Sequence, residues 1–338
     1  MKKKIGDEAI LTGKLMKKTL SMLTERSEDS LEIAKKELLQ IKIGSKNGRQ
    51  ALEYYAKNLK NITHPGILSL ACEAVGGKPD DATPMQVTML LLTAAMDIHD
   101  DVIDQTKTKN GKPTIFGKFG KDIALLIGNA ILMKGYNLLY KYGKRLPVKT
   151  MDLIHDTIQT TLFEVGNAHL LEADLKGKLD INPHEYLRVI EKKAANIEAI
   201  TRIGAIVGHG SRKEIDALAK YGKTLGTLIT LREEFVDVFE PEELQNRMES
   251  KCLPIPILYA FQNPKTKEDI LKNLSRRQVS SEATEEIVDT VYRSAHVKRL
   301  KEKMKKLYSN VLDILQENPK MSASSELKLL IRSTLEDL

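Results

Sequence analysis

The chain has 338 residues, and its 41% hydrophobic content is enough to bury a large core in one big domain or two ordinary ones. Its net charge of +7 comes from 53 basic and 46 acidic residues scattered along the whole length, with only 5% aromatic residues, which argues against nucleic-acid binding. The two cysteines, Cys72 and Cys252, have no CxxC or Cys/His context, so they indicate neither a zinc site nor an oxidising compartment, and we expect a cytoplasmic protein.

The first 60 residues carry apolar positions near helical spacing in a polar background, which predicts amphipathic helices. We expect the first 50 residues to be peripheral helices that offer a packing or partner surface. Thr63-His64-Pro65 interrupts the pattern, and an apolar helix then runs until Gly76-Gly77 ends it. The next helix is expected to have Thr83 as its N-cap and Pro84 as its first residue.

In the stretch 90–104, an apolar helical run turns without a break into a cluster of carboxylates. Four acids follow one another at positions i, i+3, i+4 and i+7, so a helix brings them to one face. They are Asp97, Asp100, Asp101 and Asp104. Such a cluster costs helix stability unless a cation offsets it, because like charges repel and Asp is a poor residue for a helix interior.

Carboxylate oxygens suit Mg²⁺, which binds through one or two carboxylates and shares its other positions with water and substrate phosphates. The alternative is a solvated acidic helix end. That reading is less favoured because acids stabilise the amino end of a helix, whereas these acids follow several apolar turns. The cluster therefore predicts a magnesium site for a substrate that carries a diphosphate.

A polar loop follows the acids, with Asn110-Gly111 as a turn signal and three lysines nearby: Lys107, Lys109 and Lys112. Long amphipathic helices are expected at residues 121–142, 148–175, 184–207 and 212–240, with further helices from residue 252 onward. The longest apolar stretch, residues 123–133, is too short to cross a bilayer, so no transmembrane segment is predicted. No strand pattern or linker interrupts these helices, which favours one all-α domain over residues 1–338.

A second group of acids, Glu233, Glu234 and Asp237, repeats the spacing of the last three acids of the first cluster. If the two clusters face each other, two carboxylate walls hold several Mg²⁺ ions around a diphosphate. Those ions neutralise the leaving group and let an allylic C–O bond ionise in a dry apolar cavity.

Together these motifs resemble the trans-isoprenyl diphosphate synthases, also called polyprenyl synthetases. Residues 100–104, DDVID, resemble the first DDxxD motif, and residues 109–114, KNGKPT, stand where the family has RRGxPT. Residues 226–237 are similar to the GxAFQxxDDxxD stretch of the second motif. Residues 191–196 resemble the region of the family's Lys-Thr pair, and residues 251–254 its KxTLP-like segment.

The resemblance covers residues 50 to 262 and implies an isoprenoid synthase-type antiparallel helical bundle around a central tunnel, usually a homodimer. In the family, both acidic motifs hold the allylic diphosphate through Mg²⁺, together with an Arg and a Lys. Those two roles map onto Lys109 and onto either Lys192 or Lys193, and Arg247 or Lys251 replaces a further phosphate lysine. The implied metal ligands are Asp100, Asp101, Asp104, Glu233, Glu234 and Asp237, of which the first three act in catalysis with the Lys192/Lys193 pair.

The positions that hold isopentenyl diphosphate in the family depart from its pattern. Here they read Asn61, His64, Thr93 and Asn110, of which three are neutral and the histidine is mostly uncharged at pH 7. We therefore expect isopentenyl diphosphate to be a poor acceptor.

The tunnel of short-chain members of the family is capped by aromatic residues four and five positions before the first Asp. Here these positions are Ala95 and Met96, so the tunnel is expected to accept a tail longer than farnesyl. Asp97 is an added acid where the family has an apolar wall residue. It forms an ion pair with a loop lysine, or serves as an extra metal ligand or a base.

The sequence leaves three functions open. The first is a Mg²⁺-dependent prenyltransferase that ionises a long allylic prenyl diphosphate, geranylgeranyl or similar. The second is a class I terpene cyclase-like enzyme, and the third is a non-catalytic prenyl-binding or regulatory subunit. The expected assembly is a homodimer, or a heteromer with an active synthase.

Overall fold

The chain divides into two compact units in the computed structural model, which describes residues 13–109, 111–274, 280–318 and 324–336. Unit 1 consists of Met1–Ile158 and Ile200–Leu218, and unit 2 of Gln159–Ala199 and Ala219–Leu338. Helices account for nearly all of the described structure, which confirms the all-α fold class. That the whole chain is one domain stays a prediction.

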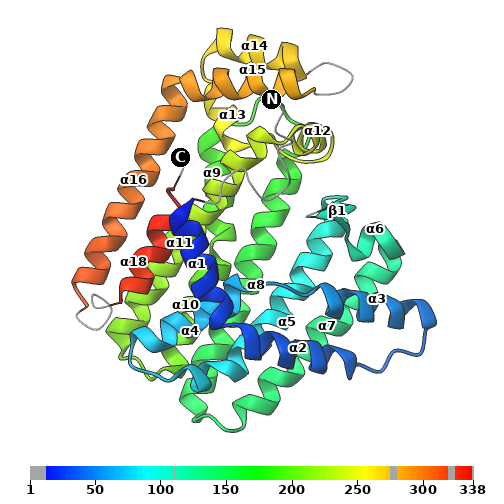
Figure 1. Ribbon diagram of the computed structural model, residues 1–338, viewed down its shortest axis with the longest axis vertical. Helices are drawn as coiled ribbons and strands as arrows, with labels where there is room; N and C mark the ends of the chain where they lie inside the picture. Colours follow the sequence, from blue (N-terminus) through cyan, green and yellow to red (C-terminus); the bar gives the residue numbers. More distant parts are fainter. Residues whose placement is uncertain (1–12, 110, 275–279, 319–323, 337–338) are drawn as a thin grey trace. The chain divides into compact units, whose positions relative to one another are not determined.

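Unit 1 is organised around the central helix α5, Pro79–Ile103 (Figure 1). Before it come α1, α2, α3 and α4, which are Lys14–Glu25, Glu28–Leu39, Lys46–Asn58 and Thr63–Ala74. After it come strands β1 (Thr108–Lys109) and β2 (Lys112–Pro113), then α6 (Ile115–Phe119) and α7 (Lys121–Gly143). The strands pair antiparallel around the turn signal at Gly111, whose φ of 68° suits glycine.

Helix α5 starts before the predicted Thr83–Pro84 boundary, so that part of the sequence prediction is wrong. Pro79 is its first residue, and the backbone N–H of Lys78 donates to Asp81 Oδ2 at 3.1 Å. This carboxylate forms half of a capping box one turn earlier than expected. Pro84 lies inside the helix, where it removes only one hydrogen bond close to the amino end.

Helices α5 and α7 pack closely because α7 places glycines against α5. A Cβ at Gly128 would lie 2.5 Å from His99 Nε2, and one at Gly135 would lie 2.8 Å from Leu92 Cδ2. Only glycine therefore allows this approach, which fixes the helix that carries the first acidic motif. Helix α2 joins the same core through Ala34, which is completely buried.

Helix α7 is the one described helix that is long and apolar enough to cross a membrane, judged by length and composition. It continues through Gly128-Asn129 without a break. Its residues Ile127, Ile131 and Leu138 are buried in the core of unit 1. A core helix meets the same criterion, so α7 does not by itself indicate a membrane protein.

Unit 2 contains the acidic helix α11 and the helices that surround its carboxyl end. The helices α8, α9, α10 and α11 are Val148–Leu175, Pro183–Lys193, Ala195–Val207 and Arg212–Val236, and parts of α8, α10 and α11 belong to unit 1. A 3₁₀ turn, η1 (Asp237–Phe239), follows α11. The remaining helices are α12 (Pro241–Ser250), α13 (Ile255–Ala260), α14 (Pro264–Leu274), α15 (Ser281–Arg293), α16 (Ala295–Gln316) and α18 (Ser325–Ser333).

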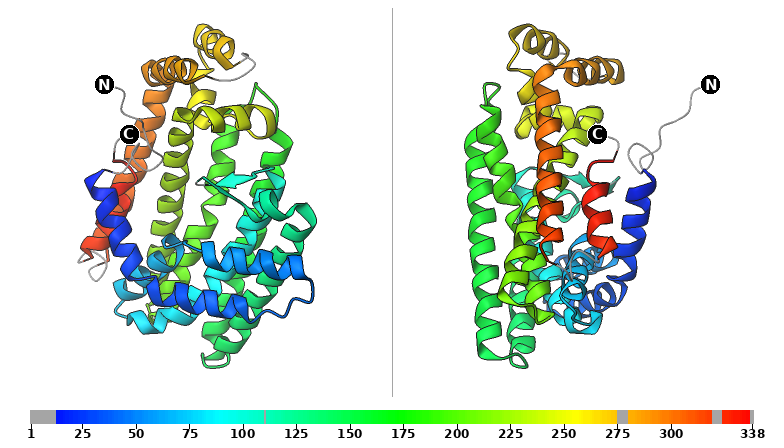
Figure 2. Two further views of the ribbon diagram at one scale, coloured as in Figure 1. Left: turned by 45° about the vertical axis from the view of Figure 1, so that its right-hand side comes forward. Right: turned by 90° about the vertical axis from the view of Figure 1, so that its left-hand side faces the viewer.

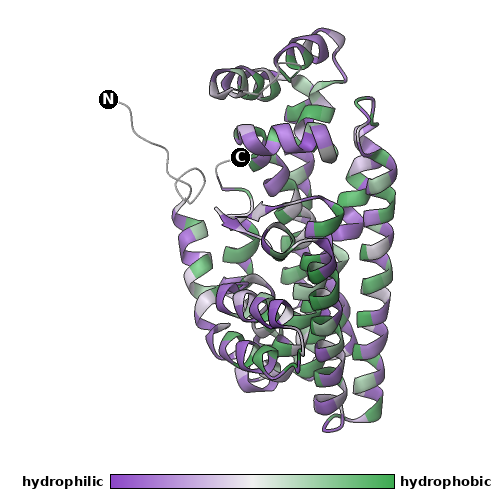
Figure 3. Ribbon diagram, turned by 90° about the vertical axis from the view of Figure 1, so that its right-hand side faces the viewer, coloured by the Kyte–Doolittle hydropathy of each residue, from purple (hydrophilic) through white to green (hydrophobic). Residues whose placement is uncertain are grey.

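The long helices were predicted well from periodicity, because each buries one apolar stripe and exposes a polar face, and Figure 3 shows both kinds of residue along the helices. Val148–Leu175 matches its prediction at both ends, whereas the helix expected over residues 184–207 breaks at Ala194. In unit 2, α14 and α15 lie side by side at one end of α16 (Figure 2).

Candidate active site

The first acidic motif lies at the carboxyl end of α5. Asp100 and Asp101 are in its last turn, and Asp104 caps it, with its backbone N–H donating to the Asp100 carbonyl at 2.8 Å. Asp101 and Asp104 are buried. The carboxyl end of a helix carries partial negative charge, so buried carboxylates there are destabilising without a cation.

Lys109 supplies a cation to this motif, as the sequence predicted for the loop. Its Nζ lies 2.5 Å from Asp101 Oδ1. Desolvation acts to lower the pKa of Lys109, but Asp101, Asp97 and Asp100 outweigh it and the pKa is raised. The β1–β2 hairpin holds the lysine in place, because Tyr54 on α3 donates to the Pro113 carbonyl at 2.7 Å.

Tyr55 on α3 belongs to this site, although sequence reasoning did not identify it. Burial raises its pKa well above the usual value, and the nearby carboxylates of Asp97 and Asp101 act in the same direction. Desolvation also raises the pKa of Asp97, to about 7, with Lys109 opposing and Asp100 reinforcing the shift, although the residue is exposed at the surface. No local pattern marks Tyr55, since it reaches the motif only through the packing of α3.

Three of the four acceptor positions form a neutral hydrogen-bonded cluster in unit 1. The backbone N–H of His64 donates to Asn61 Oδ1 at 3.2 Å, and Asn61 Nδ2 lies 3.1 Å from His64 Nδ1. Thr93 Oγ1 is 3.2 Å from the same ring nitrogen. Since an amide nitrogen only donates, Nδ1 accepts and the ring is neutral, and burial accordingly lowers the pKa of His64 to about 4. The fourth position, Asn110, lies outside the described residues.

The second acidic motif is closed by an arginine from α12. Arg247 Nη2 donates to Glu234 Oε1 at 2.8 Å and also to Asp237 Oδ2. Lys251, the alternative phosphate ligand, lies 3.2 Å from Glu243 Oε1. Both predicted cations are thus held by carboxylates of unit 2.

Glu233 and Asp237 are harder to ionise than ordinary carboxyls. Desolvation by the surrounding protein raises the pKa of Glu233 to about 7, with Asp237 and Glu234 acting in the same direction and Arg247 and Lys193 against it, although the residue is exposed at the surface. Burial raises the pKa of Asp237 to about 6, against the attraction of Arg247.

The two candidate phosphate lysines of α9 have different surroundings. Lys193 lies 2.6 Å from Glu172 Oε2, and the same glutamate accepts a hydrogen bond from Tyr186 Oη at 3.1 Å. Lys193 also acts electrostatically on Glu233, as described above. Lys192 is paired with Glu164 at 2.8 Å instead. Of the two lysines, Lys193 is the one that the fold brings to the second motif.

The donor set of the first motif fits Mg²⁺ in its chemistry, because the carboxylates of Asp101 and Asp104 are buried at the negative end of a helix and supply the oxygen ligands that this ion prefers. The second motif does not fit a metal equally well, since Arg247 already lies between two of its carboxylates. Within the described residues, no three or more His, Cys, Asp or Glu side chains are arranged to hold a metal ion. Asp101 and Asp237 are directed at Lys109 and Arg247.

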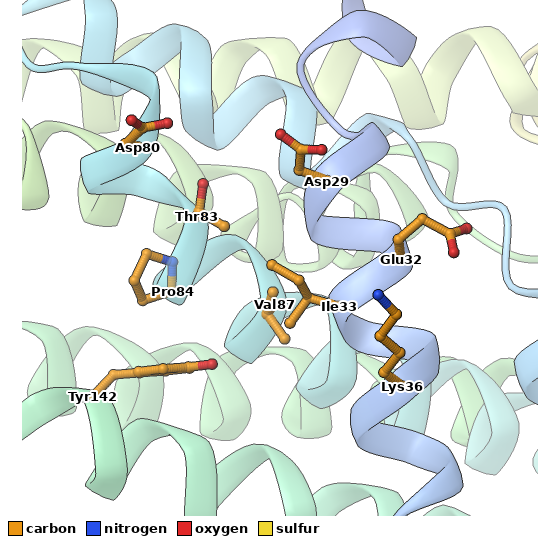
Figure 4. A pocket seen from close by; sticks show the side chains of 9 residues that line it. All are labelled: Asp29, Glu32, Ile33, Lys36, Asp80, Thr83, Pro84, Val87 and Tyr142. Atoms are coloured by element: carbon orange, nitrogen blue, oxygen red, sulfur yellow. The ribbon is translucent and has the colours of Figure 1, made fainter.

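The predicted tunnel residues lie just before the first motif. Ala95 is completely buried in the core of unit 1, and Met96 is half-buried. A separate pocket lies at the other end of α5, where Figure 4 shows Asp80 and Thr83 opposite side chains of α2. With a rise of 1.5 Å per residue, it is about 30 Å from Asp101, so it is not part of the acidic site.

The sequence model of the polyprenyl synthetase family matches residues 45–291, which is most of the chain. The chain belongs to the polyprenyl synthetase family. This confirms the family that the paired acidic motifs predicted.

Relatives of this chain include the short chain isoprenyl diphosphate synthase of Methanothermobacter thermautotrophicus, which is 31% identical over 180 residues, or 53% of this chain and 54% of the relative. The geranylgeranyl diphosphate synthase of Methanosarcina mazei is 29% identical over 190 residues, or 56% and 58%. The chain thus aligns with little more than half the length of these relatives. The crystal structure of the geranylgeranyl pyrophosphate synthetase from Pyrococcus horikoshii has a TM-score of 0.82 and 20% identity, covering 95% of this chain and 99% of that one, which shows the shared fold.

Proposed function

We propose that this polyprenyl synthetase is a Mg²⁺-dependent prenyltransferase that binds and ionises a long allylic prenyl diphosphate, geranylgeranyl or similar. The observation that carries the proposal is the buried carboxylate motif at the end of α5, with Lys109 beside Asp101. A metal ion there, when bound, polarises the diphosphate oxygens and stabilises the leaving group. The ligand roles of Asp100, Asp101 and Asp104, and of Glu233, Glu234 and Asp237, stay predictions.

The chain's own cations have separate tasks in this proposal. Asp101 would be a ligand of the metal, and Lys109, without its present partner, would contact the diphosphate instead. Lys193 is the stronger candidate of the α9 pair for a second contact, because it lies near Glu233, whereas Lys192 is paired with Glu164. Ala95 and Met96 leave room for a long tail.

The acceptor in this proposal is not isopentenyl diphosphate. Each charge-assisted contact to a diphosphate is worth about 1.5–3 kcal/mol, and the neutral cluster of Asn61, His64 and Thr93 offers none. The three lost contacts would weaken binding by several powers of ten. A neutral acceptor, which needs no such cations, fits this cluster better.

Replacing Asp101 by Asn tests the metal site. We expect calorimetry to show that Mg²⁺-dependent binding of geranylgeranyl diphosphate falls by about 100-fold or more, since even the loss of a residue that only supports a metal ligand costs 10–100-fold. Asp122→Asn, on the exposed first turn of α7, is the matched control and should bind normally. Undiminished binding by D101N would refute the metal site.

Product analysis decides the reaction. The protein is incubated with geranylgeranyl diphosphate and Mg²⁺, with and without labelled isopentenyl diphosphate. A longer labelled diphosphate would restore ordinary chain elongation, whereas transfer to a neutral acceptor supports the proposal.

The terpene cyclase-like and regulatory functions are both supported by the neutral cluster of Asn61, His64 and Thr93. This cluster lacks the positive charges that would bind a second diphosphate. A hydrocarbon or alcohol formed from geranylgeranyl diphosphate alone would favour the terpene cyclase-like enzyme. A change in rate that appears only after a second synthase is added would favour the regulatory subunit of a heteromer.

We also propose a cytoplasmic homodimer that uses the exposed face of α7. Leu126, Met133 and Tyr140 are 68%, 65% and 64% exposed and recur every seven residues, which places them on one side of the helix. A second copy would cover this apolar stripe. Met133→Glu should shift the mass in light scattering from dimer to monomer, whereas Leu39→Glu, at an exposed apolar residue of α2, should not.

A further inference from the structure

Arg247 lies among three carboxylates of unit 2. Its Nη2 contacts Glu234 and Asp237, and its Nε lies 3.5 Å from Glu243 Oε1. The side chain is only 11% exposed. Its Nη1 lies 3.4 Å from the Cys252 carbonyl. The guanidinium is therefore held from several sides, unlike a surface side chain that swings between partners.

Glu234 uses both carboxylate oxygens on protein donors. Oε1 accepts from Arg247 and lies 3.4 Å from Tyr186 Oη, and Oε2 accepts the backbone N–H of Ile255 at 2.9 Å. The residue is 4% exposed. A buried carboxylate whose two oxygens both accept hydrogen bonds from the protein is typical of a structural ion pair rather than of a metal ligand.

A magnesium ion shared by Glu234 and Asp237 would have to lie beside the guanidinium that joins them. Two cations at that separation repel, and Mg²⁺ also demands near-ideal octahedral geometry at about 2.1 Å from its oxygens. The glutamate would first have to give up Arg247, while its other oxygen stays tied to the backbone of Ile255.

We propose that Arg247 is a built-in cation which takes the place of a metal ion between Glu234 and Asp237 of the second acidic motif. This inference builds on the proposed function but makes a separate claim about Glu234. It assigns Glu234 and Asp237 to holding Arg247.

The first test measures Mn²⁺ binding by electron paramagnetic resonance in the presence of inorganic diphosphate. We expect D101N to weaken Mn²⁺ binding by roughly 10-fold or more. E234Q should stay within about 2-fold of the wild type, because the isosteric amide still accepts from Ile255 and Glu234 is not a ligand. Loss of Mn²⁺ in E234Q to the extent seen in D101N would overturn the inference. Unchanged binding in D101N would instead remove the metal site of the proposed function.

The second test does not depend on that metal site, because it uses the D101N background and thermal unfolding. Mg²⁺ should leave the Tm of D101N unchanged. It should raise the Tm of D101N/R247Q by about 2 °C or more, since the freed carboxylates can now take up the metal. Adding E234Q to that double variant should abolish the response.

A Mg²⁺ response in D101N that disappears in D101N/E234Q would show a metal at the second motif with Arg247 in place. No response in D101N/R247Q would show that the carboxylates cannot hold a metal at all. Either result would overturn the inference. If D101N/R247Q does not fold, the Mn²⁺ binding of E234Q decides the question.

Discussion

The two acidic motifs of this chain have nearly the same spacing but different cations. At the first, Lys109 comes from a two-residue strand, and its side chain is 49% exposed. At the second, Arg247 comes from a helix, is 11% exposed, and is shared by Glu234 and Asp237. The same carboxylate pattern is thus completed in one case by a cation in contact with water and in the other by a buried one.

The difference in burial between Lys109 and Arg247 indicates which motif can exchange its cation for a metal ion. A half-exposed lysine loses little when it leaves a carboxylate, because water solvates the charge of the lysine. A buried arginine cannot leave without stranding its partners in a medium of low dielectric constant. Motif spacing alone does not reveal this distinction, so the two motifs need separate tests.

The largest effect is expected from Arg247→Gln. It should lower the free energy of unfolding by about 3–5 kcal/mol in metal-free urea titrations, because it leaves buried carboxylates without their partner. Arg293→Gln is the matched control, since Arg293 pairs with Asp289 on the surface at 81% exposure. That control should cost about 0.5 kcal/mol or less. An equal loss of unfolding free energy in the two variants would show that the buried and the exposed ion pair stabilise the protein to the same extent.

Acid should destabilise unit 1 through its neutral cluster. Burial lowers the pKa of His64 from 6.5 to about 4, so the unfolded chain binds the proton more readily between these values. The stabilisation of the folded state by neutral His64 is fully present above pH 6.5 and is lost as the pH falls towards 4. It amounts to about 3 kcal/mol at most. Unfolding of the wild type and of His64→Gln, compared from pH 7 to 4, should show this difference; parallel profiles would contradict it.

The two lysines of α9 are expected to contribute differently to binding of the substrate diphosphate. Lys193→Gln should weaken binding of geranylgeranyl diphosphate with Mg²⁺ by about 10- to 100-fold, the usual loss for one charge-assisted contact to phosphate. Lys192→Gln should change it by about 3-fold or less, because Lys193, and not Lys192, acts electrostatically on Glu233 of the second motif. Calorimetric titration of both variants checks the assignment, and the reverse order would give the role to Lys192.

The smallest effect is expected for stability at the first motif. Lys109→Gln should lower the free energy of unfolding by about 1 kcal/mol or less, because the lysine is half-exposed and water screens its attraction to Asp101. The loss should shrink further in 0.5 M salt, at which the Debye length falls to roughly 4 Å. A loss as large as that of Arg247→Gln would mean that both motifs hold their cations equally tightly.

Local sequence determined most of the helices and the presence of both acidic motifs. Periodicity located Val148–Leu175 at both ends, and the i, i+3, i+4, i+7 spacing was enough to place the first four acids on one face. These features depend on residues within a few turns of each other, so the backbone geometry of a helix fixes them. The start of α5 was missed because Pro is tolerated both at the first position and inside the early turns.

Only the tertiary structure decided which side chains from distant elements lie near each motif. Tyr55 reaches the first motif through the packing of α3, and Arg247 reaches the second because α12 folds back on α11. Adjacent residues on a helix point about 100° apart, so the choice between Lys192 and Lys193 depends on which face of α9 packs towards Glu172. Such pairings arise from contacts between separate elements, whose registers no local pattern specifies.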